Sequence, residues 1–481
     1  MSIDAMLADA IALHQQGEIK EAEALYRNIL FLAPQHPQAH NALGIALQQT
    51  GRADEAADSF RRALEIKPDY TAARGNLGAA LLFLGRTGEA IECYGAAIAA
   101  EPANAEHHYN LGTALVGADR LEEAAASFAE AIALQPAHAG ARNNLGVALK
   151  ALGRLAEAEA TFRQAVGLMP QDAQMHYNLS QVLLQRGQFQ AGWREHEARF
   201  AANIAQARHQ DLPAWRGEAA DGKTILVWAE QGLGDSIQFC RYLPMLAERG
   251  AKVVFEVQAP LVRLMAALPA GITVVARDQP RPPADLQVAL MSLPGLLGTD
   301  SVEAIPAAIP YLAADPAAIA AWAERLGPKT AARRIGLVWA GSPTHKDDRN
   351  RSLPLAVMSR LVAASAVEWI SLQLGPAAEA WTEAGGQGLP SPLPAQADFA
   401  DTAAIMANLD AVVAVDTAAL HLAGAMGRPA FGLLPLAADW RWLVDRADSP
   451  WYPTLRLLRQ DSRGDWNGVL ARLAAALAGT A

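Results

Sequence analysis

A 34-residue period runs through the N-terminal part of this 481-residue chain and constrains what that part can fold into. Four series of residues recur in register: Pro34, Pro68, Pro102, Pro136 and Pro170; Gly44, Gly78, Gly112 and Gly146, with Ser180 in the next slot; Gly17, Gly51, Gly85, Asp119, Gly153 and Gly187; and Tyr26, Phe60, Tyr94, Phe128 and Phe162, followed by His196. Such a period predicts a stack of similar units, none of which can bury its apolar face alone.

This combination of small, aromatic and proline slots resembles the tetratricopeptide repeat, a helix–turn–helix unit. We expect the first glycine to let helix A press against helix B, and the aromatic residue to fill the gap to the next repeat. The proline ends helix B because its ring cannot continue the hydrogen-bond ladder. The spacing predicts five repeats within residues 1–200 and a degenerate sixth, at about 173–200, that caps the array.

One polar series lies two residues before the glycine slot of helix A: Asn76, Asn110, Asn144 and Asn178. An Asn amide offers donors and an acceptor, which suits a peptide backbone whatever its side chains are. A similar ladder binds acceptor peptides in the O-linked N-acetylglucosamine transferases, which carry the same repeats. The alternative is that these amides only bond neighbouring helices.

Composition limits the remaining possibilities. The net charge of −10 argues against a general nucleic-acid binder. The chain has two cysteines, Cys93 and Cys240, far apart in sequence, so we expect no disulfide framework and a cytoplasmic location. The N-terminus lacks the pattern of a signal peptide, and we expect no membrane span.

After a predicted linker at residues 201–222, short β-type runs alternate with amphipathic stretches. "TILVWAE", "KVVFEVQ", "ITVVARD" and "LQVALMSL" predict four buried parallel strands in a first half, 223–330. "RIGLVWAGS", "VEWISLQLG", "LDAVVAVDT" and "PAFGLLP" predict a second half, 331–481. The fold class is therefore α + α/β, an α-solenoid followed by two Rossmann-like halves with a cleft between them. This is the architecture of GT-B glycosyltransferases, although spacing alone also fits a dehydrogenase or a periplasmic-type binding protein.

The turn after the first predicted strand reads "AEQGLGDSI". It lacks the third glycine of the dinucleotide fingerprint, and no phosphate-binding GK[ST] motif follows, which argues against a dehydrogenase or a nucleoside-triphosphatase. We predict that Gln231, Gly232 and Gly234 make room for an acceptor that approaches Asp235. Two alternatives remain: Asp235 caps a helix beginning at Ser236, or Glu230 is the base instead.

The late motif "VAVDTAALHLAGAMGRP" predicts a strand followed by a helix with Thr417 at its N-cap. The first amides of such a helix suit a pyrophosphate, and His421 lies on the same helix face as Thr417. Upstream, "WAGSPTHKDDRNRSLPL" carries three cations that could neutralise a diphosphate without a metal, namely Lys346, Arg349 and Arg351. We expect the adjacent Asp347 and Asp348 to balance these cations and not to bind a metal.

These motifs are similar to those of the bacterial heptosyltransferases over about residues 223–460, most specifically in D-T-x-x-x-H-L-A-x-A-x-G-x-P. The resemblance implies that Asp235 is the general base and that Asp416, Thr417 and His421 bind the donor phosphates, with Lys346 or Arg351 as the basic loop residue. Ala418 stands where that family has glycine, so the donor need not be a heptose. Repeats joined to such a domain look like bacterial protein glycosyltransferases, including those that modify flagellin.

Further assignments depend on position alone. Gln373 is predicted to reach the nucleoside, and Arg441 to contact donor phosphate. His421 could instead be a satisfied polar residue at the sheet edge. We expect the aromatic residues Trp440, Trp442, Trp451 and Tyr452 to pack where the halves meet.

The sequence therefore predicts an inverting, metal-independent glycosyltransferase that needs no cofactor and uses a nucleotide sugar as donor. Its acceptor would be a protein hydroxyl, such as one of flagellin, presented by the repeats. One alternative is a non-catalytic adaptor that binds a client through its repeats. The other is a transferase acting on a glycan or lipid-linked acceptor.

Overall fold

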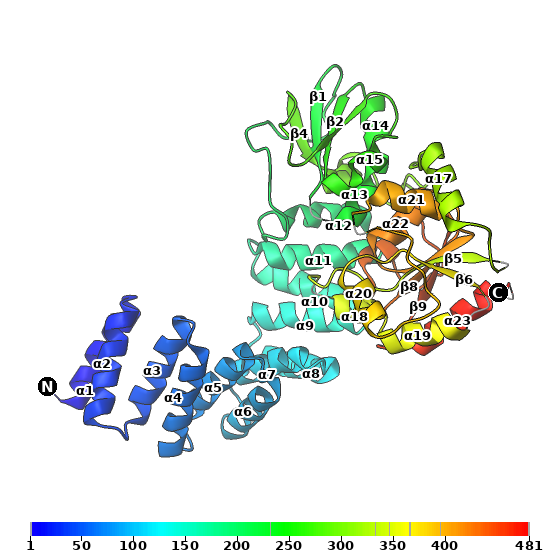
Figure 1. Cartoon of the computed structure of the whole chain (residues 1–481). Coiled ribbons are helices and arrows are strands. Elements are labelled where there is room, and N and C mark those ends of the chain that lie inside the picture. The colour runs from blue at the N-terminus through cyan, green and yellow to red at the C-terminus, as the bar shows by residue number, and fades with distance from the viewer. Residues whose placement is uncertain are drawn as a thin grey trace. The chain divides into compact units, whose positions relative to one another are not determined.

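The computed structural model describes residues 2–230, 232–331, 333–345, 347–364, 367–394 and 396–479. They divide into two compact units, Met1–Gln171 and Asp172–Ala481 (Figure 1). The division falls before the predicted end of the repeat array, because the sixth helix pair belongs to the second unit.

The first unit consists of helix pairs that follow the 34-residue period. Its helices are α1 (Ile3–Gln15), α2 (Ile19–Leu32), α3 (Pro37–Gln49), α4 (Ala53–Ile66), α5 (Thr71–Phe83), α6 (Thr87–Ala100), α7 (Ala105–Gly117), α8 (Leu121–Leu134), α9 (Ala139–Ala151) and α10 (Leu155–Leu168). The predicted solenoid is confirmed.

The glycine slot of helix A and the aromatic slot of helix B form one contact within each repeat. A Cβ atom on Gly78 would lie 2.8 Å from the Tyr94 ring, and one on Gly112 would lie 2.6 Å from Phe128. Both distances are shorter than any real carbon contact, so only glycine admits the ring. The prediction that the aromatic residue fills the gap to the next repeat is therefore incomplete, because the ring first fills the space above the glycine of its own repeat.

The other glycine series forms the turns between paired helices. Its glycines adopt φ between +73° and +86°, the left-handed region that favours glycine. Asp119 occupies the same slot with φ 61°, an arrangement that a short polar side chain tolerates.

Replacing Gly78 with Ala should destabilise the first unit, because the new methyl group would collide with the buried Tyr94 ring. Overpacking of this kind costs about 1–3 kcal/mol. Gly95 offers a matched control on the partner helix α6: it is exposed, and nothing lies within 4 Å of an added Cβ atom. G95A should stabilise by about 0.5–1 kcal/mol through helix propensity. Thermal unfolding followed by circular dichroism checks both, and equal midpoints for the two variants would contradict the packing argument.

The second unit begins with the sixth helix pair, α11 (Ala173–Gln185) and α12 (Phe189–His196), followed by the single turn η1 (Glu197–Arg199). This pair, which the sequence predicted to be a degenerate cap of the array, packs against the α/β part of its own unit. Trp193 donates its indole N–H to the carbonyl of Thr299, and Gln185 donates to the carbonyl of Ala438. The predicted linker that follows packs against the first sheet through Trp215, which is 2% exposed.

Two parallel sheets follow (Figure 1). Their strand orders are β3-β2-β1-β4 and β6-β5-β7-β8-β9. Their strands are β1 (Thr224–Trp228), β2 (Lys252–Val257), β3 (Ile272–Ala276), β4 (Leu286–Ala289), β5 (Arg334–Val338), β6 (Glu368–Ser371), β7 (Ala411–Val415), β8 (Ala430–Leu434) and β9 (Leu455–Arg459). The eight predicted strands are confirmed, and the sequence pattern did not reveal the edge strand β9. In folds of this kind, ligands bind at the loops that follow the carboxyl ends of the strands.

Helices connect and cover these strands. They are α13 (Leu233–Phe239), α14 (Leu243–Glu248), α15 (Val262–Met265), α16 (Leu293–Leu296), α17 (Pro316–Leu326), α18 (Asp348–Arg351), α19 (Leu355–Ala364), α20 (Pro376–Glu383), α21 (Phe399–Ala407), α22 (Ala418–Ala425) and α23 (Trp466–Leu477). Within the described residues, no helix is both long enough and apolar enough to cross a bilayer.

Aromatic side chains join the sixth helix pair to both sheets. Trp193 of α12 packs edge-on against Trp440, with ring centres 5.3 Å apart, and Phe239 of α13 lies 5.8 Å from Trp451. Trp440, Trp442, Trp451 and Tyr452 are all buried, as predicted. One aromatic core therefore fixes α12, α13 and the segment after β8 against one another.

Candidate functional site

Asp235 lies in the first turn of α13, just beyond the carboxyl end of β1. The helix begins at Leu233 with Gly232 as its N-cap, so Asp235 does not cap a helix that starts at Ser236. A Cβ atom on Gly232 would lie 2.5 Å from the Asp235 carboxylate. The glycine therefore makes room for this carboxylate, and the approach of an acceptor to it stays a prediction. Gln231 lies outside the described residues.

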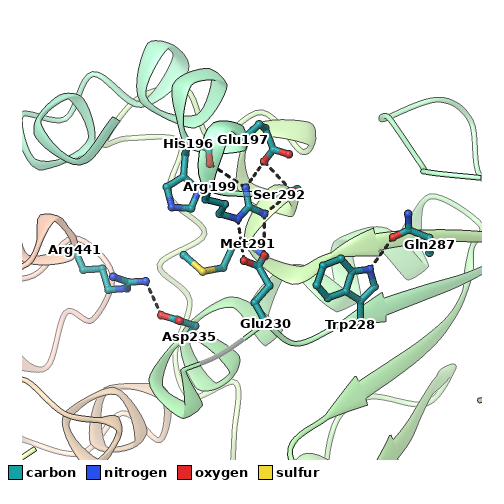
Figure 2. Close-up of polar contacts among 10 residues, drawn as sticks. All are labelled: His196, Glu197, Arg199, Trp228, Glu230, Asp235, Gln287, Met291, Ser292 and Arg441. Carbon is teal, nitrogen blue, oxygen red and sulfur yellow. Dashed lines mark hydrogen bonds and ion pairs between the residues drawn. The ribbon is translucent and has the colours of Figure 1, made fainter. Parts of the chain in front are cut away.

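The Asp235 carboxylate pairs with a cation from the other half of the unit. Nη2 of Arg441 lies 2.5 Å from its Oδ1. Figure 2 marks this contact with a dashed line. Burial raises the pKa of Asp235, and the nearby Glu230 and Asp439 raise it further, while Arg441 opposes the rise. A carboxylate with a raised pKa beside a cation is a suitable general base if an acceptor hydroxyl can reach it.

Glu230 is not available as an alternative base. Its carboxylate accepts two hydrogen bonds of 2.8 Å from Arg199, and both side chains are almost completely buried. The backbone N–H of Met291 donates to the same carboxylate (Figure 2). Arg199 also donates to Glu197 and Ser292. This buried network attaches η1 to the residue that precedes the glycine turn.

Asp416 and Thr417 follow β7, and Thr417 is the N-cap residue of α22. The Thr417 hydroxyl donates to the carbonyl of Val415 and does not cap the helix. The first amides of α22 are therefore not capped by this side chain and remain the predicted anion site, next to Ala418. Burial and the nearby Asp439 raise the pKa of Asp416 to about 6.

The His421 side chain is buried in an aromatic environment. Its ring stacks on Trp442 with centres 5.1 Å apart, and Nδ1 lies 2.9 Å from the Tyr452 hydroxyl. Burial lowers its pKa to about 3, so the imidazole is neutral near pH 7 and supplies no charge for a phosphate. This geometry favours the alternative of a satisfied polar residue.

The basic loop after β5 reaches the same region through Arg351. Its guanidinium donates to the backbone carbonyl of Asp416 at 3.1 Å and to the Asp348 carboxylate at 3.2 Å. Asp348 thus balances a cation, as predicted. Arg349 is exposed on α18, and Lys346 lies outside the described residues. Among described side chains, no group of three His, Cys, Asp or Glu residues is arranged to hold a metal ion.

Gln373 has a different environment from the predicted nucleoside contact. Its Oε1 accepts hydrogen bonds from the backbone N–H groups of Trp339 and Ala340, and its Nε2 donates to the carbonyl of Leu374. It therefore fixes the backbone where the basic loop leaves β5.

The two halves of the site meet where α13 packs against α22 (Figure 1). A Cβ atom on Gly234 would lie 2.9 Å from the His421 ring and 3.6 Å from the Cα atom of Ala418. Gly234 therefore permits close approach of two helices. The segments that follow β1 and β7, which carry Asp235 and Asp416, are thereby brought to one region.

The sequence did not predict the pairing of Arg199 with Glu230 or that of Arg441 with Asp235. No spacing rule links Arg199, near the end of the sixth repeat, to a glutamate 31 residues later. For Arg441, the sequence predicted a contact with donor phosphate, and only the structure shows that this cation pairs with Asp235 and Asp439. Two members of the Asn series form hydrogen bonds within the repeat array. Asn76 donates to Asn41 and Asn144 donates to Tyr109, each in the preceding repeat.

Two known protein families match this chain, one in its repeat part and one in its second α/β half. The tetratricopeptide repeat pattern matches residues 7–71, 76–139, 109–173 and 143–208. Glycosyltransferase family 9 (heptosyltransferase) matches residues 380–436, which contain the Asp416–His421 motif. This match is shorter than the region over which the sequence motifs resemble that family.

Individual proteins of known sequence or structure are also similar to this chain. Protein FlbA of Caulobacter vibrioides is 30% identical over 327 residues, which are 62% of this chain and 53% of FlbA. The chain thus spans about half the length of that relative. The type IV pilus biogenesis factor PilW has 21% identity and a TM-score of 0.40, with 43% of this chain and 95% of PilW covered. Pseudomonas aeruginosa PilF has 19% identity and a TM-score of 0.36, with 42% and 87% covered.

The chain therefore joins a tetratricopeptide-repeat solenoid to parallel-sheet α/β halves that resemble the heptosyltransferase family of glycosyltransferases.

Proposed function

We propose that this protein is a GT-B-type glycosyltransferase that moves a sugar from a nucleotide-sugar donor to an acceptor hydroxyl. The contact between α13 and α22 carries the proposal, because it brings a carboxylate with a raised pKa close to the N-terminus of a helix. The match to glycosyltransferase family 9 at residues 380–436 supports it.

The reaction would proceed by direct displacement. Asp235 takes the proton of the acceptor hydroxyl while the acceptor oxygen forms a bond to the anomeric carbon. The bond from that carbon to the diphosphate oxygen breaks, and the nucleoside diphosphate leaves with the bonding electrons. Arg351 and the first amides of α22 stabilise its charge, as a helix N-terminus does for anions. A single displacement inverts the anomeric centre, and no step requires a metal or a cofactor.

The acceptor would be a hydroxyl of a protein bound by the repeats in the cytoplasm. Asn76, Asn110, Asn144 and Asn178 are all partly exposed, which supports this proposal, although Asn76 and Asn144 also donate to residues of the preceding repeat. Flagellin is the acceptor suggested by the resemblance to bacterial protein glycosyltransferases.

Intact-mass spectrometry tests the proposal. The purified chain is incubated with purified flagellin and each of a panel of nucleotide sugars, including ADP-, UDP-, GDP- and CMP-linked donors. A mass increase equal to one sugar residue, seen with one donor class and absent without enzyme, is the expected result. Cells with and without this protein provide the parallel comparison of flagellin mass.

A variant of the repeats distinguishes the alternatives. Replacing the four Asn residues by Ala should reduce transfer to a protein acceptor but not slow hydrolysis of the donor by water. Unchanged transfer to flagellin would remove the peptide-binding role. Transfer to a glycan but to no protein would establish the second alternative, and donor turnover by neither route would favour the adaptor.

A further inference from the structure

The Arg441 guanidinium contacts two carboxylates, those of Asp235 and Asp439, and packs against the ring of Trp440. Arg441 lies in the short turn η5 (Trp440–Trp442), which follows β8. Nη2 is 2.5 Å from Asp235, and Nη1 is 2.8 Å from Asp439. The guanidinium carbon lies 4.3 Å from the centre of the Trp440 ring. Arg441 is 9% exposed, so the cation is nearly enclosed.

Asp439 and Trp440 hold the guanidinium independently of Asp235. Asp439 also accepts the backbone N–H of Arg441 at 3.0 Å, which fixes the turn itself. Trp440 in turn packs in the aromatic core with Trp193 and Phe239. A cation anchored in this way presents one donor to Asp235 in a defined direction (Figure 2).

Among the residues that the structure describes, the other groups around Asp235 do not provide this charge. Glu230 and Asp439 are acidic and raise the pKa of Asp235. Tyr177 of α11 lies close enough to interact electrostatically with Asp235 and Arg441, and burial raises its pKa to about 12, so it stays neutral. From α22, His421 is neutral as well, and Asp416 adds negative charge near Arg441. Of these described groups, Arg441 is the one that lowers the pKa of Asp235 by its positive charge.

We propose that Arg441 is a positioning residue for the transfer reaction, whose anchored guanidinium keeps the Asp235 carboxylate ionised and oriented for proton transfer. This inference depends on the proposed function of Asp235 as the base. Arg441 need not touch either substrate. A cation in direct contact with a partly buried carboxylate favours its charged form. Because Asp439 holds the other nitrogen of Arg441, the guanidinium donates to Oδ1 of Asp235 from a defined direction.

A pH profile separates this role from a purely structural one. The rate of transfer should rise with pH as Asp235 ionises, because only the carboxylate accepts a proton. In R441Q the acid limb of kcat/KM should move to higher pH by about one unit or more, the size of change that an adjacent opposite charge produces. R441K retains the charge but not the planar two-point contact, so its limb should stay near that of the wild type while kcat falls. R446Q, which removes a cation paired with Asp448 at the surface, is the matched control.

A second measurement needs no donor. Because burial raises the pKa of Asp235, the folded state holds this proton more tightly than the unfolded state, so unfolding becomes easier as pH rises past that pKa. Removing Arg441 should raise the pKa of Asp235 further, so the loss of stability with rising pH should become larger. At pH 8, R441Q should raise the unfolding equilibrium constant by about tenfold for every unit by which it raises the pKa of Asp235, and the increase should shrink toward pH 5. In a D235N background this pH-dependent part should disappear, which separates it from the effects of Arg441 on Asp416 and Asp439.

All 11 tryptophans lie in the second unit, between Trp193 and Trp466, so tryptophan fluorescence reports its unfolding without interference from the first unit. A shifted acid limb in R441Q, restored by R441K, supports the inference. The inference is overturned if the R441Q protein binds nucleotide and unfolds cooperatively but the acid limb of its kcat/KM profile is not shifted, even if its kcat falls. Wild-type transfer by D235N would overturn the proposed base and this inference together, whereas an inactive D235N with an unshifted R441Q overturns this inference alone.

Discussion

Replacing Asp235 with Asn should lower the transfer rate by about 10²–10⁴-fold, the usual contribution of a positioned general base. Asn has the same shape and can still accept a hydrogen bond from Arg441, which also keeps its contact with Asp439. The protein should therefore remain folded while proton transfer fails. Initial rates of product formation, measured with the donor identified by the nucleotide-sugar panel, check this, and tryptophan fluorescence verifies folding.

The pH dependence of transfer by the wild-type protein also tests whether Asp235 is the general base. Since the pKa of Asp235 is raised, the acid limb should lie above the ordinary range of an aspartate, and activity should fall as pH drops through it. D448N, which alters an exposed ion pair on the same unit, is the matched control. A D235N enzyme that works at the wild-type rate would exclude Asp235 as the base and point to a mechanism with no protein base.

Replacing Arg199 with Met should destabilise the second unit by about 3–5 kcal/mol, the cost of leaving one member of a buried ion pair without its partner. Arg199 and Glu230 have side chains only 2% and 3% exposed, and two hydrogen bonds of 2.8 Å join them. Without Arg199, the Glu230 carboxylate would lie unpaired beside β1. Urea unfolding followed by tryptophan fluorescence measures the loss.

Two comparisons make this result specific. Converting both members of the pair, R199M/E230Q, should cost less than the sum of the single variants, because no charge is left unpaired. R446M removes an arginine from an exposed pair and should change stability by under about 1 kcal/mol. If R199M were no less stable than R446M, the sixth helix pair would not depend on this ion pair for its attachment to the first sheet.

Patterns that repeat along the chain were predictable from the sequence. The 34-residue period predicted the solenoid because each slot acts locally, since one glycine admits an aromatic ring and a second glycine forms a turn with positive φ. Eight strands were recognisable as apolar runs. The edge strand β9 was missed because charged Arg456 and Arg459 interrupt its apolar pattern, which an edge position tolerates.

The site was predictable only where the residues were close in sequence. Asp235, Asp416 and Thr417 were placed at strand ends, since a parallel sheet brings the ends of its strands to one edge. The environment of each group could not be predicted in the same way. His421 is neutral because burial lowers its pKa, Gln373 is engaged by two backbone amides, and Glu230 is engaged by Arg199.

By itself, the sequence determined the repeat architecture, the two parallel sheets and the positions of polar residues at strand ends, because these depend on periodicity and on local backbone preferences. The tertiary structure alone decided which polar groups pair. Asp235 and Arg441 are 206 residues apart, and Gly234 meets His421 across two helices. Such pairings follow from how separate sheets pack, and the charge that each site residue carries depends on that packing through burial and neighbouring ions.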